Sequence, residues 1–312
     1  MMAFIQYTMQ IIMSFLMICM ISVMLPRAAV SADRVDEILT SSTLIHDPDN
    51  PVHFGENGNG EVRFDHVSFR YPGAKEDVLH DISFTAEPGM TTALIGSTGS
   101  GKSTLVNLLP RFYDVTEGKI TIDGVDIRDI SQRELRERLG YVPQKGVLFS
   151  GDIASNILYG NPEGSEEEMR KAAEIAQASE FIEEKQKKYQ SPIAQGGSNV
   201  SGGQKQRLSI ARAIAKHPDV YIFDDSFSAL DYKTDVKLRN ALKEKTAKST
   251  VLIVAQRIST ILHAEQILVL DDGKIVGKGT HRELLKNCEE YYQIASSQLS
   301  EKELENDMKE VG

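Results

Sequence analysis

Cysteine is almost absent from this sequence, and positive charge is not in excess. Only Cys19 and Cys288 occur in 312 residues, and their distance along the chain argues against a framework of disulfide bonds. The formal net charge is −10, whereas proteins that hold nucleic acid by its phosphates normally present a basic face. We therefore expect no nucleic-acid partner. Internal repeats and low-complexity tracts are also missing, and a hydrophobic content of 41% is ordinary for a protein with a core.

The beginning of the chain lacks charge altogether. From Ala3 to Leu25 no side chain is charged, and Ile, Met, Phe and Leu dominate. As a helix this run would be about 35 Å long, which is enough to cross a bilayer. Since no Lys or Arg precedes it and no small-residue cleavage pattern closes it, a transmembrane helix is favoured over a signal peptide. Arg27 and Arg34 follow the run and place its C-terminal side in the cytoplasm.

Polar side chains interrupt this apolar run at Gln6, Tyr7, Thr8, Gln10 and Ser14. In the hydrocarbon layer such groups face other helices or water, which a single helix cannot provide. We therefore expect residues 1–28 to be the last transmembrane helix of an incomplete membrane domain whose earlier helices are missing from this sequence. Helical spacing of apolar residues, followed by Ser, Asp, Asn, Pro and Gly, predicts a cytoplasmic helix extension and linker over residues 29–60.

The rest of the chain predicts an α/β protein. Apolar or alternating runs indicate strands at Glu61–Phe69, Val78–Phe84, Thr91–Ile95, Val220–Phe223, Thr250–Val254 and Ile267–Leu270. Buried strands separated by helices imply a mainly parallel sheet covered on both faces. Residues 151–217 contain no convincing strand and are expected to be a helical insertion. The Glu- and Lys-rich stretch from His281 to Gly312 is expected to be a solvated helix that frays.

A glycine-rich loop follows the apolar residues Ala93 to Ile95 and precedes an apolar helical stretch. Its sequence is Gly96-Ser97-Thr98-Gly99-Ser100-Gly101-Lys102-Ser103. The glycines let backbone amides converge on phosphate oxygens, and the following helix adds a favourable dipole. Lys102 is expected to neutralise charge on the outer phosphates, and Ser103 to offer its hydroxyl to Mg²⁺. The loop therefore predicts binding of MgATP, and we assign Thr104, the next residue, to the same site.

A carboxylate is expected to complete the magnesium site. The apolar run Val220–Phe223 ends at Asp224, which can present its side chain at the edge of the sheet beside the phosphate loop. An apolar strand that ends in Asp is a weak signal alone. Together with the loop it predicts Asp224 as the magnesium-side carboxylate.

One further motif points to a family. The sequence Val200-Ser201-Gly202-Gly203-Gln204, followed by Lys205-Gln206-Arg207, resembles the signature of ATP-binding cassette (ABC) proteins and lies between the phosphate loop and Asp224, as in that family. Three more residues resemble elements of the family. Tyr71 resembles the aromatic that stacks on adenine, and Gln144 the glutamine between the metal and the membrane domain. Asp231, in Ser228-Ala229-Leu230-Asp231, belongs to a segment that resembles the loop touching the partner cassette.

The resemblance covers residues 61–312 and implies a P-loop NTPase cassette. Such a cassette has a RecA-like core sheet, an antiparallel β subdomain and a helical subdomain, here at about 145–217. With the preceding helix, the chain resembles the end of an exporter half in the plasma membrane, with its nucleotide-binding domain in the cytoplasm. In that family two cassettes pair head to tail. Ser201, Gly202, Gly203 and Gln204 are therefore implied to contact the ATP bound by a second half-transporter.

Two positions depart from the family pattern. Asp225 stands where the family usually has the Glu that polarises the attacking water, and Gln256 where it has a switch histidine. Because catalysis depends on positioning to within about an ångström, we expect the shorter Asp225 to keep its charge and miss the water. A glutamine amide can donate to the γ-phosphate but cannot become cationic. His263, farther along, is expected to face elsewhere, and Gln195 stands where a Glu often contacts the membrane domain.

These departures resemble the degenerate subunit of heterodimeric bacterial multidrug-type exporters. The hypothesis is a transport ATPase whose own site, with Gln144, Asp225 and Gln256, binds ATP tightly and hydrolyses it slowly, while its signature completes the competent site of another subunit. A slow homodimer in which Asp225 suffices is the alternative. Two other classes share these motifs: a soluble cassette ATPase acting on nucleic acid or ribosomes, and a regulatory ATP-binding subunit without productive turnover. Residues 146–156 fit either the coupling region of such an exporter or ordinary core, and the substrate is not predictable.

Overall fold

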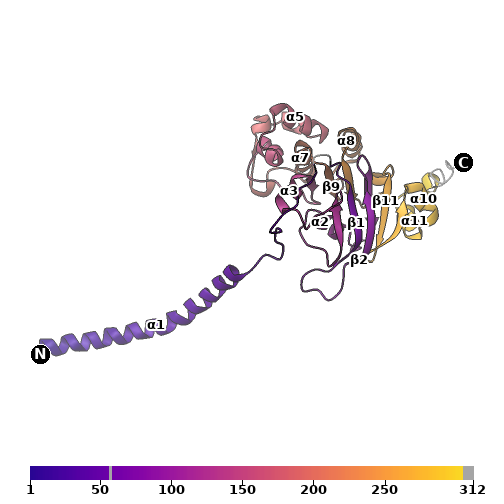
Figure 1. Cartoon of the computed structure of the whole chain (residues 1–312). Helices are drawn as coiled ribbons and strands as arrows, with labels where there is room; N and C mark the ends of the chain where they lie inside the picture. The colour runs from indigo at the N-terminus through magenta and orange to yellow at the C-terminus, as the bar shows by residue number, and fades with distance from the viewer. Residues whose placement is uncertain (56–57, 305–312) are drawn as a thin grey trace. The chain divides into compact units, whose positions relative to one another are not determined.

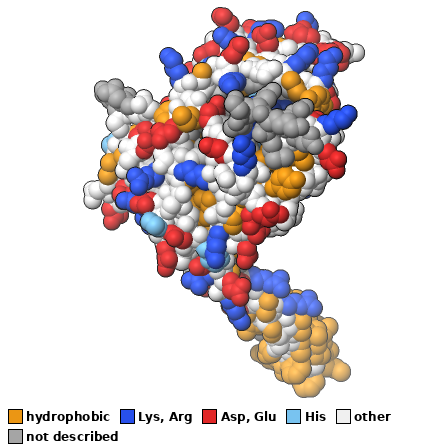
Figure 2. Space-filling view, turned by 90° about the vertical axis from the view of Figure 1, so that its right-hand side faces the viewer, with side chains coloured by type: hydrophobic (Ala, Val, Ile, Leu, Met, Phe, Trp, Pro, Cys, Tyr) orange, Lys and Arg blue, Asp and Glu red, His pale blue; other side chains and the backbone are white. Residues whose placement is uncertain are grey.

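The chain divides into two structural units, Met1–His46 and Asp47–Gly312. The structure is a computed structural model that describes residues 1–55 and 58–304. The first unit is built on one long helix, α1 (Met2–Thr40), which continues through Pro26 and buries none of its residues (Figure 1). Hydrophobic side chains cover its N-terminal part in Figure 2. Among the described residues, α1 is the one helix long and apolar enough to cross a membrane.

Part of the predicted linker belongs to the second unit. Phe54 is buried, and the guanidinium carbon of Arg138 lies 4.6 Å from the centre of its ring. The backbone N–H groups of Val52 and Phe54 donate to the backbone oxygen of Asp129 at 2.8 Å and to a carboxylate oxygen of Glu134 at 3.0 Å. The composition predicted a loop here but not these contacts. A single buried aromatic such as Phe54, among Pro, Asp and Asn, leaves no periodic pattern.

A six-stranded sheet forms the centre of the second unit. Its strand order is β12-β11-β3-β10-β9-β6. The strands are β3 (Thr91–Gly96), β6 (Leu139–Val142), β9 (Val220–Asp224), β10 (Thr250–Val254), β11 (Gln266–Asp271) and β12 (Lys274–Gly279). All neighbours pair in parallel except β11 and β12. The predicted mainly parallel sheet is confirmed, and its parallel strands bring the ends of β3, β9 and β10 to one edge.

An antiparallel sheet of order β2-β1-β4-β5 lies beside the phosphate-loop half of the core. Its strands are β1 (Val62–Phe69), β2 (Leu79–Ala86), β4 (Glu117–Ile122) and β5 (Val125–Asp126). Phe64 and Phe84 stack across β1 and β2 with ring centres 4.6 Å apart. The sequence located β1 and β2 but not β4, whose first half is exposed and whose burial is confined to its last three residues.

Helices surround these sheets. They are α2 (Lys102–Leu108), α3 (Gln132–Glu137), α4 (Ile153–Ile157), α5 (Glu166–Ile175), α6 (Ser179–Glu183), α7 (Gly202–Ala215), α8 (Tyr232–Lys245) and α9 (Ile258–Ile261), with 3₁₀ turns at Leu158–Gly160, Lys188–Gln190 and Gln195–Gly197. Between β6 and β9 the chain is mainly helical, as predicted (Figure 1). A short pair of strands, β7 (Gly151–Asp152) and β8 (Pro192–Ile193), was not anticipated, since two-residue strands leave no sequence pattern.

The C-terminal helices are part of the core. α10 (His281–Asn287) and α11 (Glu289–Ser296) place Leu284, Tyr291 and Ala295 in the hydrophobic core, where Tyr291 and Ala295 have no exposed surface. The prediction of a solvated helix is wrong for this segment. Its charges lie on the outer face, while the few apolar residues share a buried one. The predicted frayed end, residues 305–312, lies outside the described residues.

Candidate nucleotide site

The loop between β3 and α2 has a backbone that only glycine adopts readily. Gly96, Gly99 and Gly101 have φ angles of 155°, 87° and 95°. A Cβ atom on Gly96 would lie 2.0 Å from the backbone oxygen of Leu270. Among the described residues, the backbone N–H groups of Gly99, Gly101, Lys102 and Ser103 find no protein acceptor. Unpaired amides that converge in one loop form an anion-binding cradle, so the loop fits phosphate oxygens.

Lys102 crosses this loop. Its Nζ atom donates to the backbone oxygens of Gly96 and Ser97 at 2.9 and 2.6 Å and to the hydroxyl of Ser100 at 3.2 Å. Only 9% of Lys102 is exposed. Burial lowers its pKa, while the carboxylates of Asp225 and Asp224 act in the opposite direction. The ammonium group is therefore held in place at the loop before any phosphate arrives.

Ser103 and Asp224 meet at the edge of the sheet. The hydroxyl of Ser103 donates to Oδ1 of Asp224 at 2.9 Å. Burial raises the pKa of Asp224, the bond from Ser103 opposes this, and the nearby Asp225 adds to it. The Ser103 hydroxyl and the Asp224 carboxylate are oxygen ligands of the kind that Mg²⁺ prefers, and the cation would compensate the charge of the buried carboxylate. Among the described residues no group of three or more His, Cys, Asp or Glu could hold a metal.

The three residues predicted to be catalytic lie together. Oδ2 of Asp225 accepts hydrogen bonds from the side-chain amides of Gln256 at 2.8 Å and of Gln144 at 3.1 Å. The backbone of Asp225 is in the left-handed region, with φ 45°, and its N–H donates to the oxygen of Val254 at 3.0 Å. Asp is among the residue types that tolerate this region best. One carboxylate oxygen is thus engaged by both glutamines, a contact that the sequence did not predict.

Tyr71 stands beside the loop. Its hydroxyl forms a 2.9 Å hydrogen bond with that of Thr104 in the first turn of α2. Phe69 and Tyr113 meet its ring edge-on, with ring centres 4.9 and 5.1 Å away. Tyr71 is half-buried, so one part of the ring remains accessible. Sequence reasoning located Tyr71 and Thr104 but missed Tyr113, because it lies in a loop without a recognisable motif.

The signature residues form a second group. Ser201 caps α7: its hydroxyl accepts from the backbone N–H of Gln204 at 3.3 Å, and its own N–H donates to the Gln204 side chain at 3.1 Å. A Cβ atom on Gly203 would lie 3.2 Å from the backbone oxygen of Ala229, so the segment with Asp231 runs alongside. Asp231 caps α8 by accepting from Thr234 N–H at 3.0 Å. Among the described residues, no hydrogen bond or ion pair joins this group to the phosphate loop of the same chain.

The segment after Gln144 both packs in the core and faces solvent. Leu148 is buried, whereas Val147 and Phe149 are exposed by 53% and 44%. The ring of Phe149 stacks on Tyr159 with centres 4.4 Å apart, and the guanidinium of Arg212 lies over both rings. The core interpretation is confirmed for Leu148, and the coupling interpretation of this segment stays a prediction. Tyr159 and Arg212 were not identified from the sequence.

Comparison with known proteins gives the same family. Residues 79–228 match the family described as ABC transporter. An uncharacterized ABC transporter ATP-binding protein of Mycobacterium tuberculosis (strain ATCC 25618 / H37Rv) is 47% identical over 299 residues, which cover 95% of this chain and 51% of that protein. A putative multidrug export ATP-binding/permease protein of Bacillus subtilis (strain 168) is 42% identical over 277 residues, with 89% and 48% covered.

A solved structure is also similar. The structure of a bacterial Atm1-family ABC exporter with ATP bound has a TM-score of 0.83 and 35% identity, covering 88% of this chain and 48% of that one. The chain spans about half the length of the curated relatives it matches. Together with α1, these exporter relatives support the predicted membrane location, with the nucleotide-binding domain in the cytoplasm. The chain belongs to the ATP-binding cassette transporter family and carries its nucleotide-binding domain.

Proposed function

We propose that this chain is the ATP-binding subunit of an exporter, and that its own site binds MgATP firmly and hydrolyses it slowly. The proposal rests on the hydrogen bonds that the side chain of Asp225 accepts. Its Oδ2 atom is held by Gln144 and Gln256 directly beside an intact phosphate loop. Binding and hydrolysis therefore depend on different parts of the site, and only the second part departs from the family pattern.

Binding is assigned to the phosphate loop. The free amides of Gly99, Gly101, Lys102 and Ser103 would surround the phosphates, and Lys102 would turn from the loop carbonyls to the outer phosphate oxygens. Ser103, Asp224 and the side-chain oxygen of Gln144 would hold Mg²⁺, which would neutralise charge on the phosphates. Tyr71 supports the adenine ring, with its hydroxyl tied to Thr104. The unpaired amides and the Ser103–Asp224 pair support these assignments.

Slow hydrolysis is assigned to Asp225 and Gln256. A general base must reach the proton of the attacking water, and an oxygen that already accepts two hydrogen bonds is less available to receive it. Asp225 is one methylene shorter than glutamate and accepts two amide hydrogen bonds at one oxygen. Gln256 donates a hydrogen bond but carries no transferable charge. The same arrangement supports a second candidate, a regulatory subunit in which ATP binding alone changes the conformation.

The partner is assigned from the signature. Ser201, Gly202, Gly203 and Gln204, with Asp231, are separate from the loop of their own chain and are available to an ATP bound by a second half-transporter. We favour a heterodimer in which the partner carries Glu and His where this chain has Asp225 and Gln256. A homodimer is the alternative. Residues 1–28 are assigned to the last transmembrane helix, 29–60 to its extension and linker, and 61–312 to the nucleotide-binding domain with a helical subdomain at about 145–217.

The exposed aromatic patch formed by Phe149 and Tyr159 is assigned to the contact with the membrane domain. Exposed rings beside an arginine are typical of protein contacts. The fused helix and the acidic net charge argue against a soluble cassette acting on nucleic acid or ribosomes.

The ATPase activity of the full chain in lipid, alone and with candidate partner subunits, tests the proposal. Alone, the chain should bind ATP and turn it over slowly, and a partner with Glu and His at the two variant positions should raise the rate. The matched control is Asp49→Asn, which removes an exposed carboxylate outside the site. Robust activity of the chain alone, abolished by Asp225→Asn but not by the control, would overturn the heterodimer.

Tyr71 gives a prediction about the adenine contact. Tyr71→Ala should weaken ATP binding by about tenfold, because an aromatic stacking contact contributes roughly 0.5–1.5 kcal/mol beyond its buried area. Tyr71→Phe keeps the ring and loses only the bond to Thr104, so its affinity should stay within about threefold. Titration with a fluorescent ATP analogue measures both. Equal affinities for the two variants would show that the ring makes no contact with adenine.

A further inference from the structure

A cavity of about 360 Å³ lies between α8 and the segment around α9. Its floor is the face of the central sheet under α8, with Val251 and Ile253 of β10 and Phe223 of β9. Val251 and Ile253 keep 6% and 8% of their surface exposed, against 1% and 2% for Leu252 and Val254 on the opposite face. Helix α8 therefore covers this face incompletely. A cavity of this size with an apolar floor is typical of small-molecule sites.

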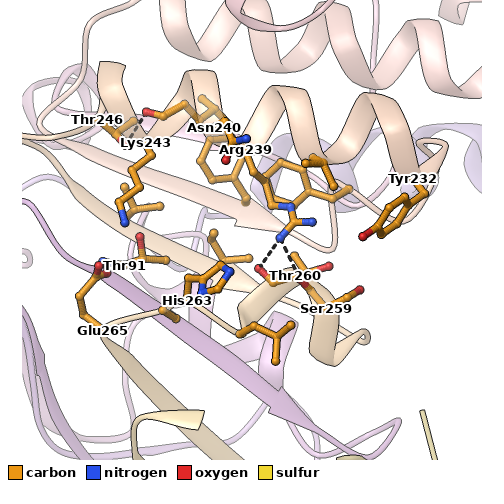
Figure 3. A pocket seen from close by; sticks show the side chains of 18 residues that line it. Thr91, Tyr232, Arg239, Asn240, Lys243, Thr246, Ser259, Thr260, His263 and Glu265 are labelled. Atoms are coloured by element: carbon orange, nitrogen blue, oxygen red, sulfur yellow. Dashed lines mark hydrogen bonds between the residues drawn. The ribbon is translucent and has the colours of Figure 1, made fainter. Parts of the chain in front are cut away.

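An arginine holds the two walls of the cavity in place. Arg239 of α8 binds both oxygens of Asp235 at 3.0 Å. Its remaining nitrogen donates to the backbone oxygens of Ser259 at 2.8 Å and Thr260 at 3.3 Å, across the cavity (Figure 3). The charge of Arg239 is thus compensated, and α8 is fixed to α9. The cavity is preformed, so a ligand does not have to order it.

Two basic side chains at the cavity have no partner in the described part of the chain. Lys243 and His263 both point into the space between the walls in Figure 3 and are exposed. Among the described residues, neither side chain makes a hydrogen bond or an ion pair, although the chain as a whole is acidic. Glu265 also lines the cavity, but its Oε2 atom accepts the backbone N–H of Thr91 at 2.9 Å. A negatively charged group that accepts hydrogen bonds complements Lys243, and the imidazole of His263 can donate a further hydrogen bond to it.

Aromatic side chains add to the apolar lining. Phe223 and Phe227, whose ring centres are 5.3 Å apart, lie at the inner end, and Tyr232 is 74% exposed at the rim. Rings of this kind favour a flat aromatic ligand, which gains both area burial and edge-to-face contacts. We propose that the cavity between α8 and α9 is a binding site for an aromatic carboxylate. Its ring lies on the floor formed by β9 and β10, and its carboxylate contacts Lys243 and His263.

Calorimetric titration of the full chain with 2-naphthoate tests this site. The protein is held in lipid nanodiscs with saturating MgADP, which keeps the nucleotide site filled, and empty nanodiscs provide the blank. 2-Naphthamide is the matched ligand of similar shape without the charge. Lys243→Glu reverses the charge at the mouth, and Leu262→Trp fills the cavity. The control variant is Lys237→Glu, which reverses an exposed charge on α8 outside the cavity.

We expect one molecule of 2-naphthoate per chain, with a dissociation constant on the order of 0.1 mM. The amide, Lys243→Glu and Leu262→Trp should each weaken binding by about tenfold or more, since each removes a charge-assisted contact or the space for the ring. Lys237→Glu should leave binding unchanged. No binding by wild-type protein that still binds ADP would overturn the proposal. So would binding that survives Leu262→Trp, because the anion would then lie outside the cavity.

Discussion

Lys102→Met should weaken ATP binding by about a hundredfold. The ammonium group already sits across the loop, bound to the oxygens of Gly96 and Ser97, and needs little rearrangement to reach the outer phosphates. A hydrogen bond to a charged group contributes about 1.5–3 kcal/mol, which is roughly one to two factors of ten in affinity. Methionine keeps the length and apolar stem of the side chain and removes only the charge, so the loss reports on the phosphate contact.

Equilibrium titration with a fluorescent ATP analogue measures this affinity in the full chain. Lys237→Met is the matched control, because Lys237 lies exposed on α8 away from the loop. It should bind ATP like the wild type. If Lys102→Met left both the affinity for ATP and the thermal unfolding midpoint unchanged, Lys102 would not be a phosphate contact.

Gly96→Ala should be severely destabilising, whereas Gly99→Ala should not. A Cβ atom on Gly96 meets the backbone oxygen of Leu270 at 2.0 Å, and neither strand can retreat because β3 and β11 pair along their whole length. A clash with backbone of this kind costs at least about 3 kcal/mol. At Gly99 a Cβ atom finds nothing within 4 Å. Its cost is confined to the left-handed backbone, about 1–2 kcal/mol.

Urea denaturation followed by circular dichroism compares the free energies of unfolding of the two variants. The sequence contains no Trp, so far-ultraviolet dichroism is the practical signal. Equal losses for the two variants would mean that the close approach to Leu270 is not a constraint on the fold.

Most of the binding site could be predicted from local sequence motifs. The phosphate loop, Asp224 and the signature are short runs whose geometry is set by their own residues and by the strands beside them. For this reason the structure places Lys102, Ser103 and Asp224 as one group. The mainly parallel sheet was predictable for the same reason, because buried parallel strands are continuous apolar runs.

Contacts between distant segments were not predictable in this way. The hydrogen bonds from Gln144 and Gln256 to Asp225 join residues 81 and 31 positions apart. The sequence predicted that the three residues share one site but not that they contact each other. The burial of Tyr291 was hidden because charged neighbours dominate the composition of its helix. Phe54 was hidden by its loop-like surroundings. In each case a single side chain forms the contact, so the spacing of hydrophobic residues in the sequence does not predict it.

The single-turnover rate of ATP hydrolysis tests the central claim most directly. The full chain in lipid is compared with the double variant Asp225→Glu/Gln256→His, with protein in excess over MgATP and well above its dissociation constant. Two copies of each protein then supply the signature for each other. The account predicts that the double variant is faster by about tenfold or more, since a longer carboxylate without the Gln256 bond can act as general base, and that ATP affinity stays within about threefold. A wild-type rate equal to or above that of an ATP-binding double variant would contradict it.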